Sequence, residues 1–447
     1  MLTPSGIASD MTTKDFFASI AENDRLIRLY DFENKKNFFP DVHASFKFCI
    51  LNFGGVEVTH KPADFAFFIH KVEELDEKQK HISLTGADIK LLNPNTRTCP
   101  IFRTRRDADI TKAIYRRVPV LIDSSRKGPT KNLWGITFKT MFHQTNDAEL
   151  FREADKLKAD GCKLKGNRWV KGKQVFLPLY EAKMFRPYDH RFGSVYEDTK
   201  NWINQGQTHE STLVEHQNPE YVVQPRWWVD IDEVAKGLET FVPPALLAYR
   251  DITRSTDVRT FLATFIPSVG VINTAPVMRF DGIDPPLQVC LLACLNSLPF
   301  DFVAKQKVGH IHMNFFIVEQ LPTLTPDTYA KPCPWSKKKT TLEKWISERV
   351  LKLTCTAGDM LPLAEACDFT GGSFAEYEGR LHKWDEAERA ELMAELDAAY
   401  FHLYGIDRDD AEYILGTFKG IHADRPLLAS GESTAQLVLA KYDEFAV

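Results

Sequence analysis

Two short groups of residues have the types and the spacing that cleavage or metal chemistry would need. Glu181 and Lys183 form an E-x-K triplet downstream of Asp160, which fits half of a metal-dependent nuclease site. His310 and His312 alternate, so their side chains could share one face as metal ligands. Such triplets are common by chance, and no cysteine or carboxylate stands at a ligand spacing from the histidines. We therefore assign no catalytic residue and no metal ligand, with a nuclease kept as an open alternative.

The strongest charge signal is a basic run, residues 93–117, in a chain whose net charge is −5: NPNTRTCPIFRTRRDADITKAIYRR. Residues 97–139 hold eleven Lys or Arg and three Asp, and residues 152–191 add eleven basic and five acidic side chains. Residues 365–447 hold eighteen acidic and seven basic side chains. A basic middle beside an acidic C-terminal part is what a groove for a polyanion would require, whereas the plainer interpretation is two solvated faces.

Length and composition set the class of protein. The 447 residues suffice for two or three domains, and 44% hydrophobic and 26% charged residues are typical of a soluble globular chain. No apolar run reaches the roughly 18–20 residues of a membrane span, and the N-terminus lacks the pattern of a secretion signal. The eight cysteines are scattered. Cys290 and Cys294 are expected to be buried free thiols, which predicts a cytoplasmic protein.

The elements that would position these groups alternate between helix and strand at first and become helical later. Three apolar stretches predict strands, at residues 25–32, 46–55 and 65–70. A sheet that began with these strands would expose an inner strand, so we infer that the first half of this domain lies elsewhere. Helices are predicted over 14–23 with Thr12 and Thr13 as caps, over 107–117, from 286, and over 386–405 with Gly405 as the terminator.

Seven blocks of sequence, in order over nearly the whole chain, carry a family likeness: PSGIASDMTTKDFF, LYDFENKKNFFPDVHASFKFCILNFGG, NPNTRTCPIFRTRRDADITKAIYRRVPVL, MFHQTNDAELF, PLYEAKMFRPYDHRF, LNSLPFDFVAKQKVGHIHMNFFIVEQLP and AAYFHLYGIDRDDAEYILGTF. They resemble N6-adenine DNA methyltransferases, above all type IIG restriction–modification enzymes and the large methyltransferases of phage-defence systems. The first two blocks are similar to the late part of the catalytic domain, and the third to the link that leads out of it. The remaining four resemble target-recognition and C-terminal segments.

The resemblance implies an α/β fold with four parts. These are a partial Rossmann-like methyltransferase sheet (1–92), a basic linker (93–139), a mixed α+β target-recognition domain (140–330) and a mostly helical acidic region (331–447). It also implies double-stranded DNA as a partner and S-adenosylmethionine as the cofactor of the complete enzyme. The expected function is DNA binding and target recognition in a restriction–modification or phage-defence system.

Two motifs of the family are not in their expected place. One is a Gly-rich FxGxG-type turn for S-adenosylmethionine, and the other is Asn/Asp/Ser-Pro-Pro-aromatic, which holds the flipped adenine. Both would lie upstream of Met1. We therefore expect that the chain alone binds no cofactor and transfers no methyl group. It should need a protein partner or a missing upstream segment that carries the cofactor-binding half.

Three near-matches to these motifs are weak. Asp284-Pro285-Pro286-Leu287 has the polar-Pro-Pro pattern but lacks the aromatic, and Pro-Pro is a plausible helix start. Phe369-Thr370-Gly371-Gly372-Ser373 only echoes a Gly-rich turn. Asn93-Pro94-Asn95-Thr96 lacks the second proline and is expected to be a capping turn.

The basic run is expected to line the cleft between the catalytic sheet and the recognition domain, because planar guanidinium groups hold phosphate oxygens well. Its members are Arg97, Arg103, Arg105, Arg106, Lys112, Arg116 and Arg117. Sequence choice would come from residues 140–330, where Arg or Lys would read guanine and Asn or Gln adenine. The candidates there are Arg186, Arg191, Arg250, Lys305, Lys307 and Asn314, with Asp189, His190, Arg254, Gln306 and His312 beside them.

Two other classes of function stay open on the sequence. One is a self-sufficient enzyme, either a permuted methyltransferase or a nuclease, which cofactor titration or a magnesium-dependent nicking assay would reveal. The other is a non-catalytic partner or inhibitor subunit that docks on a methyltransferase through its exposed sheet edge. The paired Trp227 and Trp228 are expected to be core aromatics, which such residues are more often than base-stacking platforms.

Overall fold

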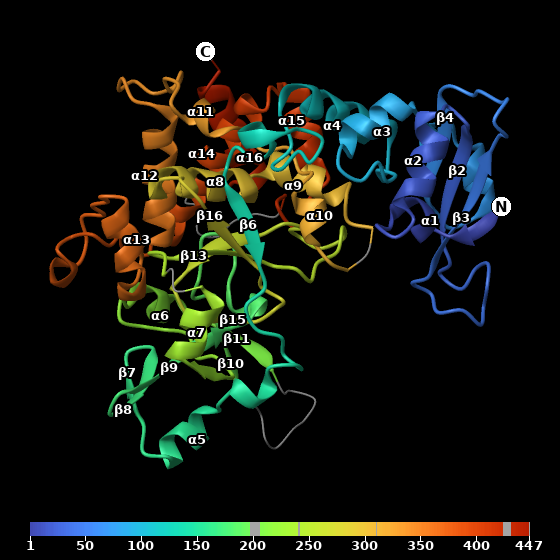
Figure 1. The fold of residues 1–447 in the computed structure, drawn as a ribbon. Coiled ribbons are helices and arrows are strands. Elements are labelled where there is room, and N and C mark those ends of the chain that lie inside the picture. The colour runs from blue at the N-terminus through green and yellow to red at the C-terminus, as the bar shows by residue number, and fades with distance from the viewer. Residues whose placement is uncertain (197–205, 240–241, 310, 423–430, 447) are drawn as a thin grey trace.

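A mixed five-stranded sheet forms the N-terminal unit, residues 1–92, of this computed structural model, which describes residues 1–196, 206–239, 242–309, 311–422 and 431–446 (Figure 1). Its strands, in the spatial order β1-β3-β2-β4-β5, are β1 (Leu2–Pro4), β2 (Leu26–Glu33), β3 (Lys47–Phe53), β4 (Ala63–Ile69) and β5 (Ile82–Leu84). β2 and β4 are parallel, and the other neighbouring pairs are antiparallel. The three predicted strands are confirmed. The relation of this sheet to a Rossmann-like methyltransferase sheet stays a prediction.

Helices pack on one face of this sheet: α1 (Gly6–Ser9), α2 (Lys14–Glu22) and α3 (Gly86–Leu92). Phe17 of α2 and Ile89 of α3 share a buried cluster with Phe65 of β4. The opposite face carries a small aromatic group, in which the rings of Phe32 and Phe48 stack with their centroids 5.1 Å apart. The first face therefore joins the main core of the molecule, and the second has a small cluster of its own.

The bridging segment, residues 93–135, connects the N-terminal unit to the rest of the chain and contains α4 (Arg105–Arg117). Thr104 and Asp107 form a capping box, in which each side chain accepts a hydrogen bond from the other residue's amide. Ile110 and Ile114 are buried in the main core. The helix ends before Pro119, because a residue that precedes proline avoids the helical conformation. The predicted helix is confirmed and starts two residues earlier than expected.

The central sheet is antiparallel, in the order β14-β13-β16-β6, and its strands β13 and β14 are buried on both faces. Its strands are β6 (Ile136–Lys139), β13 (Leu246–Tyr249), β14 (Ala263–Ile266) and β16 (Val277–Phe280). Leu247 and Tyr249 pack in the main core, whereas Leu246 and Ala248 pack in a second core. Successive side chains of a strand point to opposite faces, so this sheet is a wall shared by two cores. β6 lies in the stretch that the sequence predicted to be a linker.

The middle unit, residues 140–282, contains the second core and extends below the central sheet in Figure 1. Its remaining strands are β7 (Lys163–Lys165), β8 (Arg168–Lys171), β9 (Gln174–Tyr180), β10 (Gly193–Tyr196), β11 (Gln207–Glu210), β12 (Trp228–Asp230) and β15 (Gly270–Val271). Its helices are α5 (Ala154–Ala159), α6 (Leu213–Gln217) and α7 (Ile231–Gly237). Trp228 is fully buried, as predicted, and Trp227 packs on Phe151 with ring centroids 5.5 Å apart.

The helical region, residues 283–446, packs on the main-core face of the central sheet. Its helices are α8 (Pro285–Asn296), α9 (Leu298–Lys305), α10 (Phe315–Val318), α11 (Pro326–Tyr329), α12 (Leu342–Thr354), α13 (Leu361–Ala366), α14 (Glu386–Leu403), α15 (Arg408–Gly416) and α16 (Thr434–Glu444). Gly405 adopts a φ of 65° just after α14, so the predicted terminator is confirmed. Cys290 and Cys294 of α8 are buried free thiols, as predicted.

Within the part of the chain that the structure describes, no single helix is long and apolar enough to cross a membrane. α8 and α9 together have the required length and composition, but they meet at 55° and are mostly buried in the core.

Candidate nucleic-acid interface

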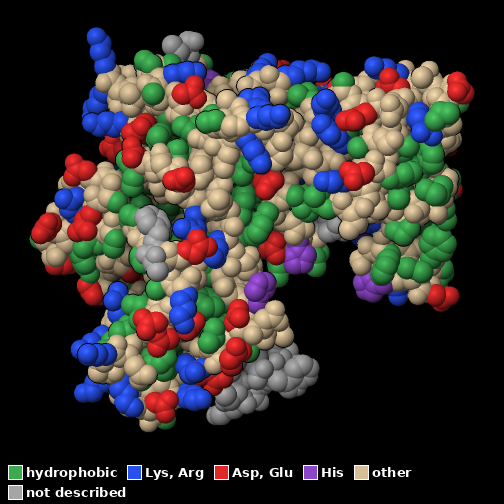
Figure 2. Space-filling view, viewed as in Figure 1, with side chains coloured by type: hydrophobic (Ala, Val, Ile, Leu, Met, Phe, Trp, Pro, Cys, Tyr) green, Lys and Arg blue, Asp and Glu red, His purple; other side chains and the backbone are tan. Residues whose placement is uncertain are grey.

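A wide notch in the outline of the molecule, open to solvent, separates the N-terminal unit from the middle unit in Figure 2, and we call it the hollow. The bridging segment and the helical region run along one side of the hollow and join the two units (Figure 1). The loop after α9 meets the start of the N-terminal unit at the inner end of the hollow. A ligand that entered the hollow would therefore face both units at once.

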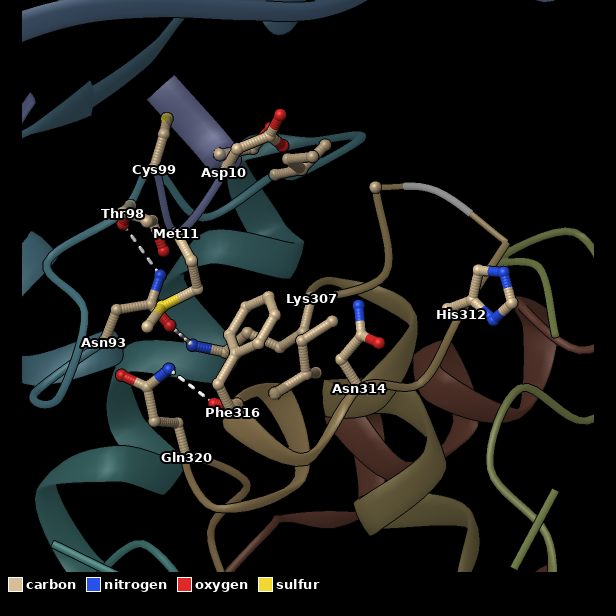
Figure 3. A pocket seen from close by; sticks show the side chains of 14 residues that line it. Asp10, Met11, Asn93, Thr98, Cys99, Lys307, His312, Asn314, Phe316 and Gln320 are labelled. Atoms are coloured by element: carbon tan, nitrogen blue, oxygen red, sulfur yellow. Dashed lines mark hydrogen bonds between the residues drawn. The ribbon is translucent and has the colours of Figure 1, made fainter. Parts of the chain in front are cut away.

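The junction cavity lies at this meeting point, has a volume of about 200 Å³ and opens to solvent. Its lining comes from the N-terminal unit, the bridging segment, and the chain from the loop after α9 through α10 to Gln320 (Figure 3): Ser9, Asp10, Met11, Asn93, Thr98, Cys99, Ile101, Lys307, Gly309, His312, Asn314, Phe316, Ile317 and Gln320. Hydroxyls, amides, a thioether and one aromatic ring predominate. Such a lining suits a planar polar group that is held by hydrogen bonds and stacking.

The Lys307 side chain lines this cavity, and its ammonium group is already bonded to other parts of the chain. Its ammonium group donates to the Asn93 side-chain oxygen at 2.6 Å and to the Leu92 carbonyl, and it lies 4.7 Å from the Tyr115 ring centroid. Burial lowers the pKa of Lys307 well below its usual range. The predicted base-reading lysine therefore joins the loop after α9 to the bridging segment.

Two of the cavity amides are also used by the fold. Asn93 donates to the Thr98 carbonyl at 2.8 Å, and the Gln320 side-chain oxygen accepts from the Asn95 amide at 2.9 Å. Asn314 differs, because it is exposed at the N-cap of α10 and makes no side-chain cap bond. Its side-chain amide is available to a ligand.

His312 stands beside Asn314 on the rim of the cavity (Figure 3). Its Nδ1 lies 2.6 Å from an Asp251 carboxylate oxygen, and the side chain is 44% exposed. The carboxylate fixes the ring orientation and leaves Nε2 free to face a ligand. His310 lies outside the described residues.

Four arginines of the basic run contact the N-terminal unit. The Arg97 Nε lies 3.4 Å from a Glu22 carboxylate oxygen, and the Arg103 guanidinium lies 4.1 Å from the Phe68 ring centroid. Arg105 donates to the His81 carbonyl at 3.4 Å, and Arg116 lies 4.0 Å from an Asp88 carboxylate oxygen. These contacts attach the bridging segment to α2, α3 and the sheet.

The rest of the run contacts the helical region or its own helix. The Arg106 guanidinium donates to one Asp410 carboxylate oxygen from Nε at 3.1 Å and from a terminal nitrogen at 2.9 Å. Arg117 donates to the Gly405 carbonyl, and Lys112 lies 3.0 Å from Asp109 on α4. The acidic C-terminal part thus neutralises part of the basic run. Contact of this run with DNA stays a prediction, and it would have to compete with these partners.

The predicted base-reading Arg191 is fully buried. Its guanidinium donates to the carbonyl oxygens of Asn218 at 2.9 Å, Tyr221 at 3.0 Å and His216 at 2.9 Å. It also donates to the Thr356 carbonyl at 3.3 Å, which links the middle unit to the helical region. No face of this side chain is open to a ligand, so we leave Arg191 out of the proposed interface.

The neighbours of Arg191 are also buried. His190 lies 2.9 Å from an Asp359 carboxylate oxygen and Asp189 lies 3.2 Å from His216. Burial acts to raise the pKa of Asp359, but the opposing charges of His190 and Arg191 hold it below the usual range. Arg186 is half-buried over the Phe192 ring, 3.8 Å from its centroid. Residues 186–192 therefore hold the middle unit against the helical region.

Two further candidates are half-buried: Arg250 follows β13, and Lys305 is the last residue of α9. Arg250 donates to the Arg259 carbonyl at 3.1 Å and lies 3.4 Å from an Asp257 carboxylate oxygen. Lys305 lies 3.5 Å from the Phe418 ring centroid, and burial lowers its pKa to about 8. Of the secondary candidates, Gln306 is buried and Arg254 is exposed.

The nuclease candidates do not form a metal site. Glu181 is buried and pairs with Lys183 and with Arg226, each at 3.2 Å. Asp160 lines a separate pocket, beside α5. Within the described residues, no group of three or more His, Cys, Asp or Glu could hold a metal ion.

Two of the near-matches to methyltransferase motifs have structural roles in the fold. Pro285 and Pro286 start α8, with Asp284 at its N-cap, so the plainer interpretation of this motif is confirmed. At the Gly-rich turn, a Cβ on Gly371 would lie 2.4 Å from the Leu381 backbone. Gly371 therefore packs tightly on its own chain, whereas Gly372, with a φ of 76°, has open space around it.

The sequence analysis missed the part of the junction cavity that the N-terminal unit supplies. Ser9, Asp10 and Met11 lie far in sequence from the loop after α9, and neither their types nor their spacing marks them. Only the packing of the bridging segment against α9 brings these segments together.

No family model and no curated protein matches this sequence. Among solved structures, one similar chain is a type IIG restriction endonuclease, BpuSI, with 11% sequence identity and a TM-score of 0.29. The alignment covers 90% of this chain and 47% of that enzyme, so the chain spans about half of its length. This is a weak likeness to a restriction enzyme, and at this TM-score it carries no argument about function.

Proposed function

We propose that this chain binds double-stranded DNA across the hollow, as the target-recognition part of an N6-adenine DNA methyltransferase in a restriction–modification or phage-defence system. The observation that supports the proposal is the hollow itself, with the polar junction cavity at its inner end (Figures 2 and 3). A duplex placed there would be contacted from two sides. The family resemblance of the sequence blocks adds the reaction class, which the geometry alone does not give.

Asn314 is the side chain in this arrangement best suited to read a base. It is exposed at the rim of the junction cavity and has a free amide. An asparagine amide can bond to the N6 and N7 edge of adenine with both of its polar atoms. Ile311, which is 48% exposed in the same loop, offers an apolar contact beside it.

S-adenosylmethionine would be held by a polypeptide segment that extends the N-terminal sheet. β1 is the edge strand of this sheet, and its Leu2 side chain is 59% exposed. Among the described residues, ten of the twenty exposed large apolar side chains lie in residues 1–58. An open edge beside an apolar surface is suited to strand addition by a partner or by an upstream segment. The chain alone is therefore proposed to transfer no methyl group.

A salt titration of duplex binding tests the proposal, with wild-type chain compared with Asn314→Ala. Wild type should bind with a steep dependence on salt, because phosphate contacts release counterions. Loss of one bidentate base contact should cost about 1–3 kcal/mol on the preferred sequence and leave the salt slope unchanged, because no phosphate contact is removed. Fluorescence anisotropy with labelled duplexes measures both quantities.

The matched control is Asn23→Ala, since the Asn23 side chain is exposed and bonds within its own helix, to the Ser19 carbonyl at 2.7 Å. This variant should bind like wild type. Absence of wild-type binding at about 50 mM salt would refute the proposal.

The exposed apolar surface of residues 1–58 also supports a second candidate, a subunit that docks on a methyltransferase without touching DNA. Titration calorimetry with S-adenosylmethionine separates the remaining possibilities. Heat of binding with the isolated chain would indicate a self-sufficient enzyme. Lack of heat together with lack of DNA binding would favour the docking subunit.

A further inference from the structure

A hairpin of the middle unit carries a dense group of basic side chains away from the hollow. β7 and β8 form this hairpin, on the side of the middle unit that faces away from the N-terminal unit (Figure 1). Residues 156–173 include seven Lys or Arg and a single acidic residue, Asp160. The basic residues are exposed: Lys156, Lys158, Lys163, Lys165, Arg168, Lys171 and Lys173.

The register of the hairpin sorts these side chains by face. Lys165 stands directly opposite Arg168, so both point to one face, and Lys163 shares that face two residues earlier. Leu164 pairs with Trp169 on the other face, where Trp169 is buried in a small cluster of its own. We call Lys163, Lys165 and Arg168 the hairpin face.

The positive charges of the hairpin face are not neutralised by acidic side chains among the described residues. In the part of the chain that the structure describes, no hydrogen bond or ion pair engages these three side chains. Like charges that stand directly opposite across two strands destabilise a sheet. Lysines on an edge strand such as β7 protect the strand from pairing with another chain. This protection does not explain Arg168, which stands opposite Lys165 on the inner strand β8. An external anion would relieve the repulsion that the free chain retains.

We propose that the hairpin face is a second contact for duplex DNA, independent of sequence, which binds the sugar–phosphate backbone outside the hollow. The binding partner, duplex DNA, is taken from the proposed function. The location of the site comes from the hairpin itself. Side chains two residues apart on a strand are about 6.8 Å apart, comparable to two steps of duplex rise at about 3.4 Å each. A regular line of phosphates fits this spacing, and it carries no base-reading requirement.

The test compares the salt dependence of duplex binding between the wild-type chain and the triple variant Lys163→Ala, Lys165→Ala, Arg168→Ala. Each lost phosphate contact lowers the slope of log K against log salt by about 0.9, so the triple variant should lose roughly three units of slope. The loss should be equal for specific and random duplexes. Thermal unfolding checks that this exposed face tolerates the changes.

The control variant is Lys337→Ala, Lys338→Ala, Lys339→Ala, which removes the same charge from an exposed loop of the helical region. It should leave the slope unchanged. An equal loss of slope in this control would show that the effect depends on net charge alone, and it would overturn the inference. Wild-type slope in the hairpin variant would also overturn it and leave the proposed function intact. Failure of the wild type to bind DNA would remove both.

Discussion

At the scale of single residues, Asp397 of α14 is a buried carboxyl with an unusual environment. Its Oδ1 accepts a hydrogen bond from the Leu298 amide at 2.8 Å. Burial raises its pKa to about 6, although the charge of Arg259 opposes the shift. The folded chain therefore holds a proton here that the unfolded chain releases at lower pH. Stability should fall as pH rises from about 4 to 6, because the unfolded state then binds fewer protons.

The variant Asp397→Asn should remove this pH dependence. A shift of two pKa units corresponds to about 3 kcal/mol in the free energy of unfolding, fully expressed above pH 6. The asparagine oxygen can still accept from the Leu298 amide, so the contact itself is retained. Urea unfolding of both proteins at several pH values between about 4 and 7 measures the difference. Parallel stability curves for the two proteins would contradict the assignment.

At the scale of elements, the bridging segment is held by charge on both sides. Its arginines contact the N-terminal unit through Glu22 and Asp88 and the helical region through Asp410. The basic run and the acidic C-terminal part, which the sequence shows as separate charge blocks, are therefore partly joined in the fold. α4 supplies the buried face of this connection through Ile110 and Ile114.

A double-mutant cycle on Arg106→Ala and Asp410→Ala should give a coupling of about 0.2–1 kcal/mol, because the pair is partly exposed. The side chains are 47% and 32% exposed, so the coupling should shrink in high salt. Chemical unfolding of the two single variants and the double variant at low and high salt measures it. A coupling of several kcal/mol would contradict this prediction, because it would require a pair that is buried rather than partly exposed.

Elements were easier to predict than contacts. The strands at 25–32, 46–55 and 65–70 and the helix ended by Gly405 follow from local patterns of apolar residues and glycine, which act over a few positions. The burial of Arg191 does not, because its partners are backbone carbonyls that a sequence does not display. β6 was missed for a similar reason: its partner strand, β16, lies far away in the chain.

At the scale of the whole molecule, the central sheet joins the main core to the core of the middle unit. Leu247 faces the first and Leu246 the second. Each side chain is almost completely buried, so its truncation should leave a cavity in one core only. The shared wall nevertheless makes the two cores dependent on each other.

The variants Leu246→Ala and Leu247→Ala should each lower the free energy of unfolding by about 2–5 kcal/mol. Each should shift one common transition, because the middle unit and the helical region share their sheet. Differential scanning calorimetry distinguishes this from two separate transitions. If Leu246→Ala lowered the melting temperature of one peak and left another in place, the cores would be independent.

The shared wall also limits how the molecule can be re-engineered. A middle unit cut out at residue 140 would lose β6, and its remaining sheet would present a bare apolar face that invites aggregation. A chimaera designed to exchange specificity would therefore have to import the central sheet together with the unit, and match the side chains of α8 that cover it. A unit can be exchanged between proteins only where few packing contacts cross its boundary. In this chain such a boundary does not coincide with the domain boundary that the sequence suggests at residue 140.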